Sequence, residues 1–241
     1  MKVRMSKLAL LTFGTEHYRV GSWRGQPAIG YVAPLSPPEL LTRTGLEQVL
    51  ARLARRGYRE VLTAALTESE QSFFRGAGFA VHERLHLLQH DLEAVAPPAT
   101  GPSELRRIRR WHHRALLGVD ARSFDPFWKL DRANLVEAIR ATPSTRLTGC
   151  FVRGCVGYAI TGFAGDQGYL QRLAVDPDHQ GRGLATALVH DSLAWLVQRG
   201  ATAASVNTQE SNTRALDLYE RLGFSQVHPG LAVLRYSLAS A

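Results

Sequence analysis

The chain has 241 residues, 45% of them hydrophobic, and a formal net charge of +8 at pH 7. A chain of this length can bury a core in one large or two small domains, and its composition excludes a disordered or low-complexity protein. No stretch approaches the roughly 20 apolar residues of a membrane-spanning helix, so no membrane partner is expected. The opening MKVRMSKLALLTF has too short an apolar run for a signal peptide and no cleavage site, which predicts a first β-strand and a cytoplasmic protein.

The positive charge predicts an anionic partner, and nucleic acid, an acidic protein and a phosphorylated cofactor all fit. Most of the excess is arginine spread over expected helices, where a solvated basic face explains it equally well. Cys150 and Cys155 could close a hairpin disulfide, but two cysteines make no framework and cytosolic thiols are usually reduced. His112 and His113 would point about 100° apart on a helix and make poor joint ligands, so no metal site is expected.

The first clear break in the chain is AVAPPATGPS, residues 94–103, whose proline, alanine and glycine content is typical of an interdomain linker. It separates a first domain, 1–93, from a second, 104–241. The second domain opens on PSELRRIRRWHHRALL, which predicts a helix over 102–117 with Ser103 as its N-cap. An aromatic loop and a second helix follow.

The rest of the second domain alternates regularly. Two strands over 148–154 and 155–165 are joined by a tight Arg-Gly turn, and a third strand covers 169–176. The later elements are a helix, a strand, a helix and a strand over 183–200, 202–210, 211–223 and 231–239. An antiparallel run followed by alternating strands and helices predicts an α/β (α+β) mixed sheet with helices on both faces.

A glycine-rich turn, DPDHQGRGLATALV, joins the third strand to its helix. Gly181 and Gly183 let backbone N–H groups approach an anion closely, the helix N-terminus adds partial positive charge, and Arg182 adds a full charge. The turn is not a Walker loop, since no Gly-Lys-Ser/Thr follows, and its glycine spacing is not that of a dinucleotide fingerprint. Taken alone, it predicts a phosphate-binding turn, with an ordinary strand-to-helix turn as the alternative.

The surroundings of this turn carry a family resemblance. The pattern Gln-x-x-Gly-x-Ala, at Gln180, Gly183 and Ala185, follows LAVDPD and precedes a distant N…LYERLGF. This combination resembles the GNAT superfamily of N-acetyltransferases over residues 123–238, in the superfamily's usual order of elements. The resemblance implies the acyl-CoA N-acyltransferase (GNAT) fold and acetyl-CoA as the co-substrate.

The resemblance also implies roles for individual residues. In this superfamily the glycine loop holds the pyrophosphate of acetyl-CoA, the strand before it pairs with the pantetheine arm and the acetyl carbonyl, and an asparagine opening the later helix contacts the same arm. The implied cofactor-binding residues are Leu173, Ala174, Val175, Gln180, Gly181, Arg182, Gly183, Leu184, Ala185, Thr186 and Asn212.

The implied catalytic residue is Tyr219, which in this superfamily usually faces the cofactor sulfur as general acid. Seven residues make about two helical turns, so Tyr219 would share a face with Asn212. A phenol with a pKa near 10 is protonated at neutral pH and can supply a proton to a departing thiolate. The alternatives are an aromatic side chain packed under the helix and, for Asn212, a simple helix cap.

The implied mechanism is direct attack of an amine on the thioester, without an acyl-cysteine intermediate. Relatives commonly carry an acidic base at positions where this chain has Tyr169 and Asn207, so a dedicated carboxylate base is in doubt. An α-amine with a pKa near 8 is on the order of a tenth deprotonated at pH 7, whereas a lysine near 10.4 is below about a tenth of a per cent. This favours a protein or peptide α-amine, or another low-pKa amine, over lysine.

Five residues are candidates for the acceptor side of the site. The loop SFDPFW precedes the second helix, where this fold usually forms a wall of the acceptor cleft. The alternative, equally well supported, is that Phe124 and Trp128 pack in the hydrophobic core. Strand alternation would place 169, 171 and 173 on one face, where a relay water could be held. The candidates are Phe124, Asp125, Trp128, Tyr169 and Gln171.

The first domain resembles a shortened copy of the same fold, because VLTAALTESEQSFFRGAGF aligns without a gap on the final strand-helix unit of the second. Its turn, APLSPPELLTRTGL, has Pro37 and Pro38, which cannot donate N–H groups. Thr67 stands at the position of Asn212, and Phe74 at that of Tyr219 has no proton to give. The alternative is convergence of two generic helix endings.

The sequence therefore predicts an acetyl-CoA-dependent N-acetyltransferase with one active and one degenerate domain, acting on a primary amine of a protein N-terminus or a small molecule. A non-catalytic acyl-CoA sensor is the main alternative. A nucleic-acid-binding protein that uses the basic helices is the less expected third hypothesis. The acceptor's identity and the oligomeric state are left open.

Overall fold

The structure is a computed structural model that describes residues 8–93, 95 and 104–238. Most of the predicted linker and the predicted cap Ser103 lie outside these residues. Contacts divide the chain into two compact units: unit 1 comprises Met1–Leu87, Asn207–Asn212 and Val227–Ala241, and unit 2 comprises Leu88–Val206 and Thr213–Gln226. Within the described ranges, no helix is long and apolar enough to cross a membrane, and no group of three or more His, Cys, Asp or Glu side chains could hold a metal ion.

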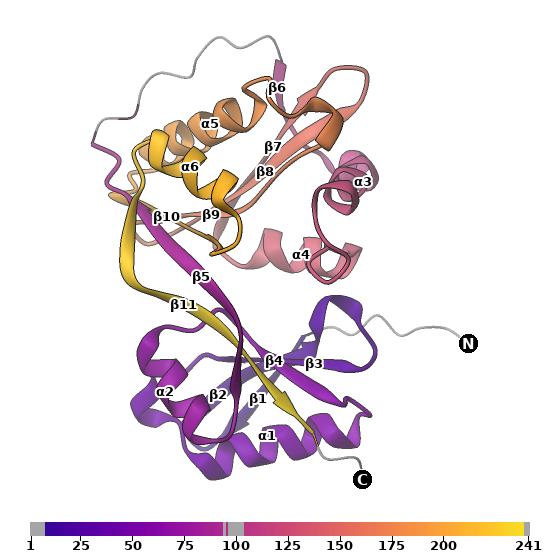
Figure 1. The fold of residues 1–241 in the computed structure, drawn as a ribbon, viewed down its shortest axis with the longest axis vertical. Helices are drawn as coiled ribbons and strands as arrows, with labels where there is room; N and C mark the ends of the chain where they lie inside the picture. Colours follow the sequence, from indigo (N-terminus) through magenta and orange to yellow (C-terminus); the bar gives the residue numbers. More distant parts are fainter. Residues whose placement is uncertain (1–7, 94, 96–103, 239–241) are drawn as a thin grey trace. The chain divides into compact units, whose positions relative to one another are not determined.

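Unit 1 is a mixed sheet packed against two helices (Figure 1). Its strands β1, β2 and β3 are antiparallel, β3 runs parallel to β4, and β11 pairs antiparallel with β4. The element bounds are β1 Ala9–Phe13, β2 Glu16–Ser22, β3 Ile29–Pro34, α1 Arg43–Arg55, β4 Glu60–Thr63, α2 Glu68–Gly76, β5 Ala80–His90 and β11 Ser225–Ser237. Leu46, Val49 and Leu53 from α1 are fully buried in the core of this unit.

Unit 2 has helices on both faces of a sheet with the strand order β10-β9-β8-β7-β6 (Figure 1). The pair β10–β9 is parallel, and the other pairs are antiparallel. The bounds are β6 Glu104–Arg107, α3 His113–Ser123, α4 Arg132–Arg140, β7 Ser144–Phe151, β8 Cys155–Ala164, β9 Gln167–Val175, α5 Leu184–Gln198, β10 Ala203–Gln209 and α6 Thr213–Arg221. The mixed α/β architecture predicted from the sequence is confirmed.

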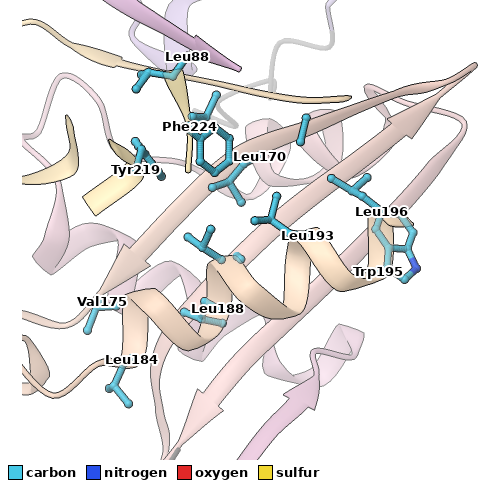
Figure 2. Packing of buried hydrophobic residues seen from close by; sticks show 14 of the residues in the cluster. Leu88, Leu170, Val175, Leu184, Leu188, Leu193, Trp195, Leu196, Tyr219 and Phe224 are labelled. Carbon is cyan, nitrogen blue, oxygen red and sulfur yellow. The ribbon is translucent and has the colours of Figure 1, made fainter. Parts of the chain in front are cut away.

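Two hydrophobic clusters cover the two faces of this sheet. Leu116 of α3 and Leu135 of α4 are buried with Tyr158 on one face. On the other face, Leu188 and Leu196 of α5 pack with Tyr219 of α6 and the strand residues beneath them, as Figure 2 shows. Strand β9 therefore contributes side chains to both layers.

The predicted helix over 102–117 is wrong in its first half. Residues 104–107 form edge strand β6, a single 3₁₀ turn covers Arg110–His112, and the α-helix begins only at His113. Leu105 pairs with Cys150 of β7, and Ile108 is buried in the α3-side cluster. Burial of these two side chains against the sheet outweighs the helix propensity of the arginines around them.

The last strand of each half of the chain crosses the boundary between the units. Strand β5 begins in unit 1, but its Leu88 is fully buried in the α5-side cluster of unit 2. Strand β11 begins in unit 2, but its Ala232 and Leu234 are buried in the core of unit 1. The core of each unit is thus completed by residues from the opposite half of the sequence.

Helices α2 and α6 end in the same hydrogen-bonded geometry. The N–H of Phe79 donates to the carbonyl of Phe74 at 3.1 Å, and that of Phe224 donates to the carbonyl of Tyr219 at 3.0 Å. The glycine before each phenylalanine has a positive φ, 94° and 88°, as this ending requires. The aromatic rings pack at 5.1 Å in the first ending and 5.6 Å in the second. The repeated Gly-Phe phrase of the sequence is therefore a repeated helix stop.

Candidate active site

Strand β9 carries a β-bulge at its centre. Its register with β8 pairs Leu170 with Thr161 and Arg172 with Ile160, which leaves Gln171 as an extra residue without a partner across the ladder. A bulge of this kind reverses the alternation of side chains between the two faces of a sheet.

The expectation that residues 169, 171 and 173 share one face is wrong because of this bulge. Tyr169 pairs with Gly162, and Gln171 reaches Thr142 on the α4 side of the sheet. Leu173, two residues beyond the bulge, instead packs against the α5-side cluster. Gln171 therefore lies on the α4 side of the sheet, and Leu173 lies on the α5 side.

The edge of β9 that faces β10 is paired only at its beginning. Parallel pairing is recorded for three residue pairs, from Ala203↔Gln167 to Ser205↔Tyr169. Among the described residues, β9 from 170 to 175 is paired with β8 alone. Backbone groups on such an edge can bond an extended ligand that carries amides of its own.

The glycine turn follows β9 directly and leads into α5. Gly181 and Gly183 have positive φ of 74° and 75°, and a Cβ on either would meet no protein atom within 4 Å. Gly183 is the N-cap of α5 and offers no side-chain cap to the first N–H groups of the helix. Those donors therefore lack a side-chain partner next to an open turn, and the exposed Arg182 lies beside them.

The turn is held by hydrogen bonds at both ends. Gln180 donates from Nε2 to the carbonyl of Val175 at 3.0 Å, and its Oε1 accepts from Arg214 of α6. Asp176, at the start of the turn, forms an ion pair with Arg122 at 2.5 Å. Burial pushes the pKa of Asp176 upward, but hydrogen bonds from Arg122 and the N–H of Asp178 outweigh it and hold the pKa below its usual value. The carboxylate stays charged and fixes the end of β9.

Tyr219 of α6 is 5% exposed and packs in the same cluster as Val175 and Leu184, which flank the glycine turn (Figure 2). Within the described part of the chain, its hydroxyl has no hydrogen-bond partner. Burial raises the pKa of Tyr219, and no other group contributes to the shift. The phenol is therefore protonated at neutral pH and has a proton that is not engaged within the protein.

The aromatic loop after α3 is held against β9 by Arg172. The guanidinium of Arg172 stacks on the ring of Phe124 at 3.5 Å from its centroid and donates to the carbonyl of Trp128 at 2.8 Å. Asp125 turns inward on its own loop, since its carboxylate accepts from the N–H of Phe127 at 2.9 Å. Arg172 of β9 therefore contacts the ring of Phe124 and the backbone carbonyl of Trp128, whereas the Asp125 carboxylate bonds within its own loop.

Arg172 belongs to a buried network that sequence reasoning missed. Asp120 of α3, with a side chain that is 0% exposed, accepts from Arg172 at 2.8 Å and from the hydroxyl of Tyr158 at 2.5 Å. The second oxygen of Asp120 accepts from the N–H of Leu130 at 2.6 Å. The signal was an arginine inside the apolar strand LQRLAVD and an aspartate on the apolar face of a helix, because buried charges need partners.

The side chain of Gln171 occupies a narrow space next to Gly162, where any larger residue would overlap it. Its Nε2 is 3.4 Å from the hydroxyl of Thr142, and its Oε1 is buried with no hydrogen-bond partner in the described chain. A Cβ on Gly162 would overlap Nε2 of Gln171 and Oγ1 of Thr142. Tyr169, the neighbouring candidate, is 38% exposed.

Three other sequence candidates are placed as follows. Asn212 immediately precedes α6 and belongs to unit 1, and its N–H donates to the carbonyl of Gln209 at 2.9 Å. Cys150 and Cys155 are free, buried thiols, so no disulfide joins them. Burial raises the pKa of Cys150 to about 12, which leaves no thiolate for an acyl-cysteine route.

A surface cavity of about 450 Å³ lies in unit 1. Residues of α2, β5 and β11, among them Arg75, Arg84 and Gly230, line it. Its lining includes none of the glycine turn, so we do not assign it to the candidate site, whose chemistry lies in unit 2.

Comparisons with known proteins agree with the geometry of unit 2. Residues 105–224 match the sequence profile of the Acetyltransferase (GNAT) family. Over 69 residues the chain is 39% identical to "[Ribosomal protein bS18]-alanine N-acetyltransferase" of Escherichia coli strain K12, which covers 29% of this chain. The chain spans about half, 47%, of the length of that curated relative.

Two solved structures share the fold over most of the chain. A GCN5-related N-acetyltransferase from Sphaerobacter thermophilus matches with a TM-score of 0.64 and 18% identity, over 92% of this chain and 76% of that one. A tandem GNAT protein from the clavulanic acid biosynthesis pathway matches with a TM-score of 0.71 and 14% identity, over 96% of this chain and 82% of that one. At these identities the likeness shows the fold alone.

Proposed function

We propose that the chain is an N-acetyltransferase that moves an acetyl group from acetyl-CoA to a primary amine, because residues 105–224 match the profile of the Acetyltransferase (GNAT) family. The observation that carries the proposal is the glycine turn, an open turn that leaves the first N–H groups of α5 without a side-chain cap at the end of a strand with a free edge. The preferred acceptor is the α-amine of a protein or peptide, with a small-molecule amine second.

The residues around the turn fit a pyrophosphate with an amide-bearing arm. Gly181 and Gly183 leave the turn open to a close approach by an anion, and Arg182 adds a positive charge that is not neutralised within the turn. The edge of β9 at 173–175 would pair with the pantetheine amides. Acetyl-CoA supplies the activated thioester when bound.

The reaction we propose is a direct transfer. The amine nitrogen attacks the thioester carbonyl, the new C–N bond forms as the C–S bond breaks, and the sulfur leaves as a thiolate. Tyr219 gives its hydroxyl proton to that sulfur, and this role is supported by its protonated hydroxyl in the same buried cluster as Val175 and Leu184. Backbone N–H groups of β9 at the bulge would polarise the carbonyl.

The acceptor side favours an amine that is partly deprotonated on its own. Asp120 and Asp125 are both committed to bonds within the protein, so neither is free to act as a base. Gln171 and Tyr169 of β9 would hold a relay water for the departing proton. An α-amine needs this help less than a lysine does, and the relative named for an alanine acceptor is consistent with that preference.

We further propose that unit 1 contains a degenerate copy of the fold. The order of three antiparallel strands, helix, strand, helix and strand is the same from β1 to β5 as from β7 to β11. The buried carboxylate of Glu16 accepts from the N–H and hydroxyl of Thr42, and the Thr42 side chain accepts in turn from the N–H of Gly45. The N-terminus of α1 is thereby filled by the protein's own acid, whereas that of α5 is open.

The proposal is tested by following thiol release from acetyl-CoA with matched peptides. One peptide has a free α-amine and an acetylated lysine, and the other has a blocked α-amine and a free lysine. The expected result is release with the first peptide and little with the second. Tight acetyl-CoA binding with no release for any peptide or small amine would instead favour the non-catalytic acyl-CoA sensor.

A further inference from the structure

The segment from β6 to the start of α3 is unusually basic and carries an exposed tryptophan. Between Leu105 and Val119 it holds five arginines and two histidines, and no acidic residue. Trp111 is 69% exposed, although tryptophan is usually largely buried. Neither feature belongs to the acetyl-donor site proposed above.

Aromatic rings and guanidinium groups in this region form a continuous series of contacts, which we call the ring ladder. Arg106 lies 6.0 Å from the ring of Phe151, and Phe151 is 5.1 Å from His112. His112 is 5.6 Å from Trp111, and Arg109 lies 5.3 Å from the ring of Trp111. The N–H of Arg109 donates to Nδ1 of His112 at 3.2 Å, which holds the two ends of the turn together.

The arginines nearest Trp111 form no ion pair within the described part of the chain. Arg109, Arg110 and Arg114 enter none of the ion pairs among the described residues. The pKa of His113 is lowered by burial and then by the positive charges of Arg110, Arg132 and His112. The local field is therefore positive over several side chains, and an anion would be attracted to it.

We propose that the ring ladder is a docking surface for single-stranded nucleic acid, with bases stacked on Trp111 and phosphates paired with the surrounding arginines. Exposed aromatic faces interleaved with guanidinium groups are what single-stranded nucleic acids use. An acidic peptide would bind to the arginines alone, so it would not explain why the flat face of Trp111 is exposed among them. A lipid surface would need more apolar side chains than Trp111 and the exposed Val152 provide. The surface lies outside the proposed transfer site, so the inference stands whether or not the chain acetylates an amine.

The test is binding of a labelled single-stranded 12-mer to the full chain, followed by fluorescence anisotropy at several salt concentrations. Neutralising three or four phosphates predicts a slope of log affinity against log salt of about −2 to −3. Replacing Trp111→Ala removes no charge and should weaken binding about 5- to 150-fold, whereas Trp111→Phe should retain most of it. Arg109→Ala with Arg110→Ala should flatten the salt slope.

The matched control is Arg52→Ala with Arg55→Ala, which removes two exposed charges from α1 in unit 1 and should leave binding unchanged. Saturating oligonucleotide should also quench tryptophan emission in the wild type and much less in Trp111→Phe. Equal binding by wild type and Trp111→Ala would overturn the proposal. So would equal or tighter binding of a duplex, of a poly-glutamate peptide or of anionic phospholipid vesicles.

Discussion

Gly183→Ala tests whether the glycine turn binds the acetyl donor. Gly183 has a φ of 75°, and an added Cβ would meet no protein atom within 4 Å. The substitution therefore costs about 1 to 2 kcal/mol of backbone strain without a clash. The new methyl group stands where a phosphate would approach the first N–H groups of α5. Loss of one charge-assisted hydrogen bond, about 1.5 to 3 kcal/mol, predicts a Kd for acetyl-CoA about 10- to 150-fold higher.

The control lies at the other end of the same helix. Gly200 has a φ of 80° and also has no protein atom within 4 Å of an added Cβ. Gly200→Ala should therefore lower the free energy of unfolding by a similar amount and leave the Kd for acetyl-CoA unchanged. Isothermal titration calorimetry measures the Kd, and urea unfolding measures the strain. Equal Kd values for the two variants would refute the assignment of the turn.

Two further predictions concern the acceptor face and unit 1. In Gly162→Ala the new Cβ overlaps the amide of Gln171, so the Gln171 side chain should be displaced. We expect kcat/KM for the amine to fall about tenfold or more and the Kd for acetyl-CoA to stay unchanged. Steady-state kinetics measures the first quantity and calorimetry the second. Burial pushes the pKa of Glu16 upward, but hydrogen bonds from Thr42 and Tyr18 outweigh it and lower the pKa below its usual 4.5. The ionised Glu16 carboxylate therefore contributes its full stability above pH 4.5, and this contribution is lost as the pH falls below the lowered pKa. The difference in thermal midpoint between wild type and Glu16→Gln should be large at pH 7 and shrink towards pH 3.

Local patterns in the sequence were sufficient for most elements of unit 2. The helix stop at Gly223 and the glycine turn at 181–183 have positive φ, a backbone conformation that favours glycine, so both were predictable from the glycines. Strand β6 was not, because its arginines favour a helix and only the partner strand β7 makes Leu105 and Ile108 a strand. Long-range pairing has no local signal.

In the candidate site, too, the features that depend on long-range contacts could not be predicted from the sequence. The bulge at Gln171 depends on the register of β8, and no residue type marks it in the sequence. Arg172 and Asp120 lie 52 residues apart in the chain, so their ion pair could be suspected from two charges in apolar patterns but not assigned. Burial of Leu234 in unit 1 was equally hidden, because it requires β11 to leave the half of the chain in which it begins.

The central claim is that unit 2 performs the transfer with Tyr219 as proton donor and that unit 1 does not. The most direct measurement is kcat for acetyl transfer to an α-amine peptide by Tyr219→Phe and by Phe74→Tyr. We predict that Tyr219→Phe lowers kcat by about 10²-fold or more with an unchanged Kd for acetyl-CoA, and that Phe74→Tyr leaves kcat unchanged. A Tyr219→Phe variant with wild-type kcat would contradict the account.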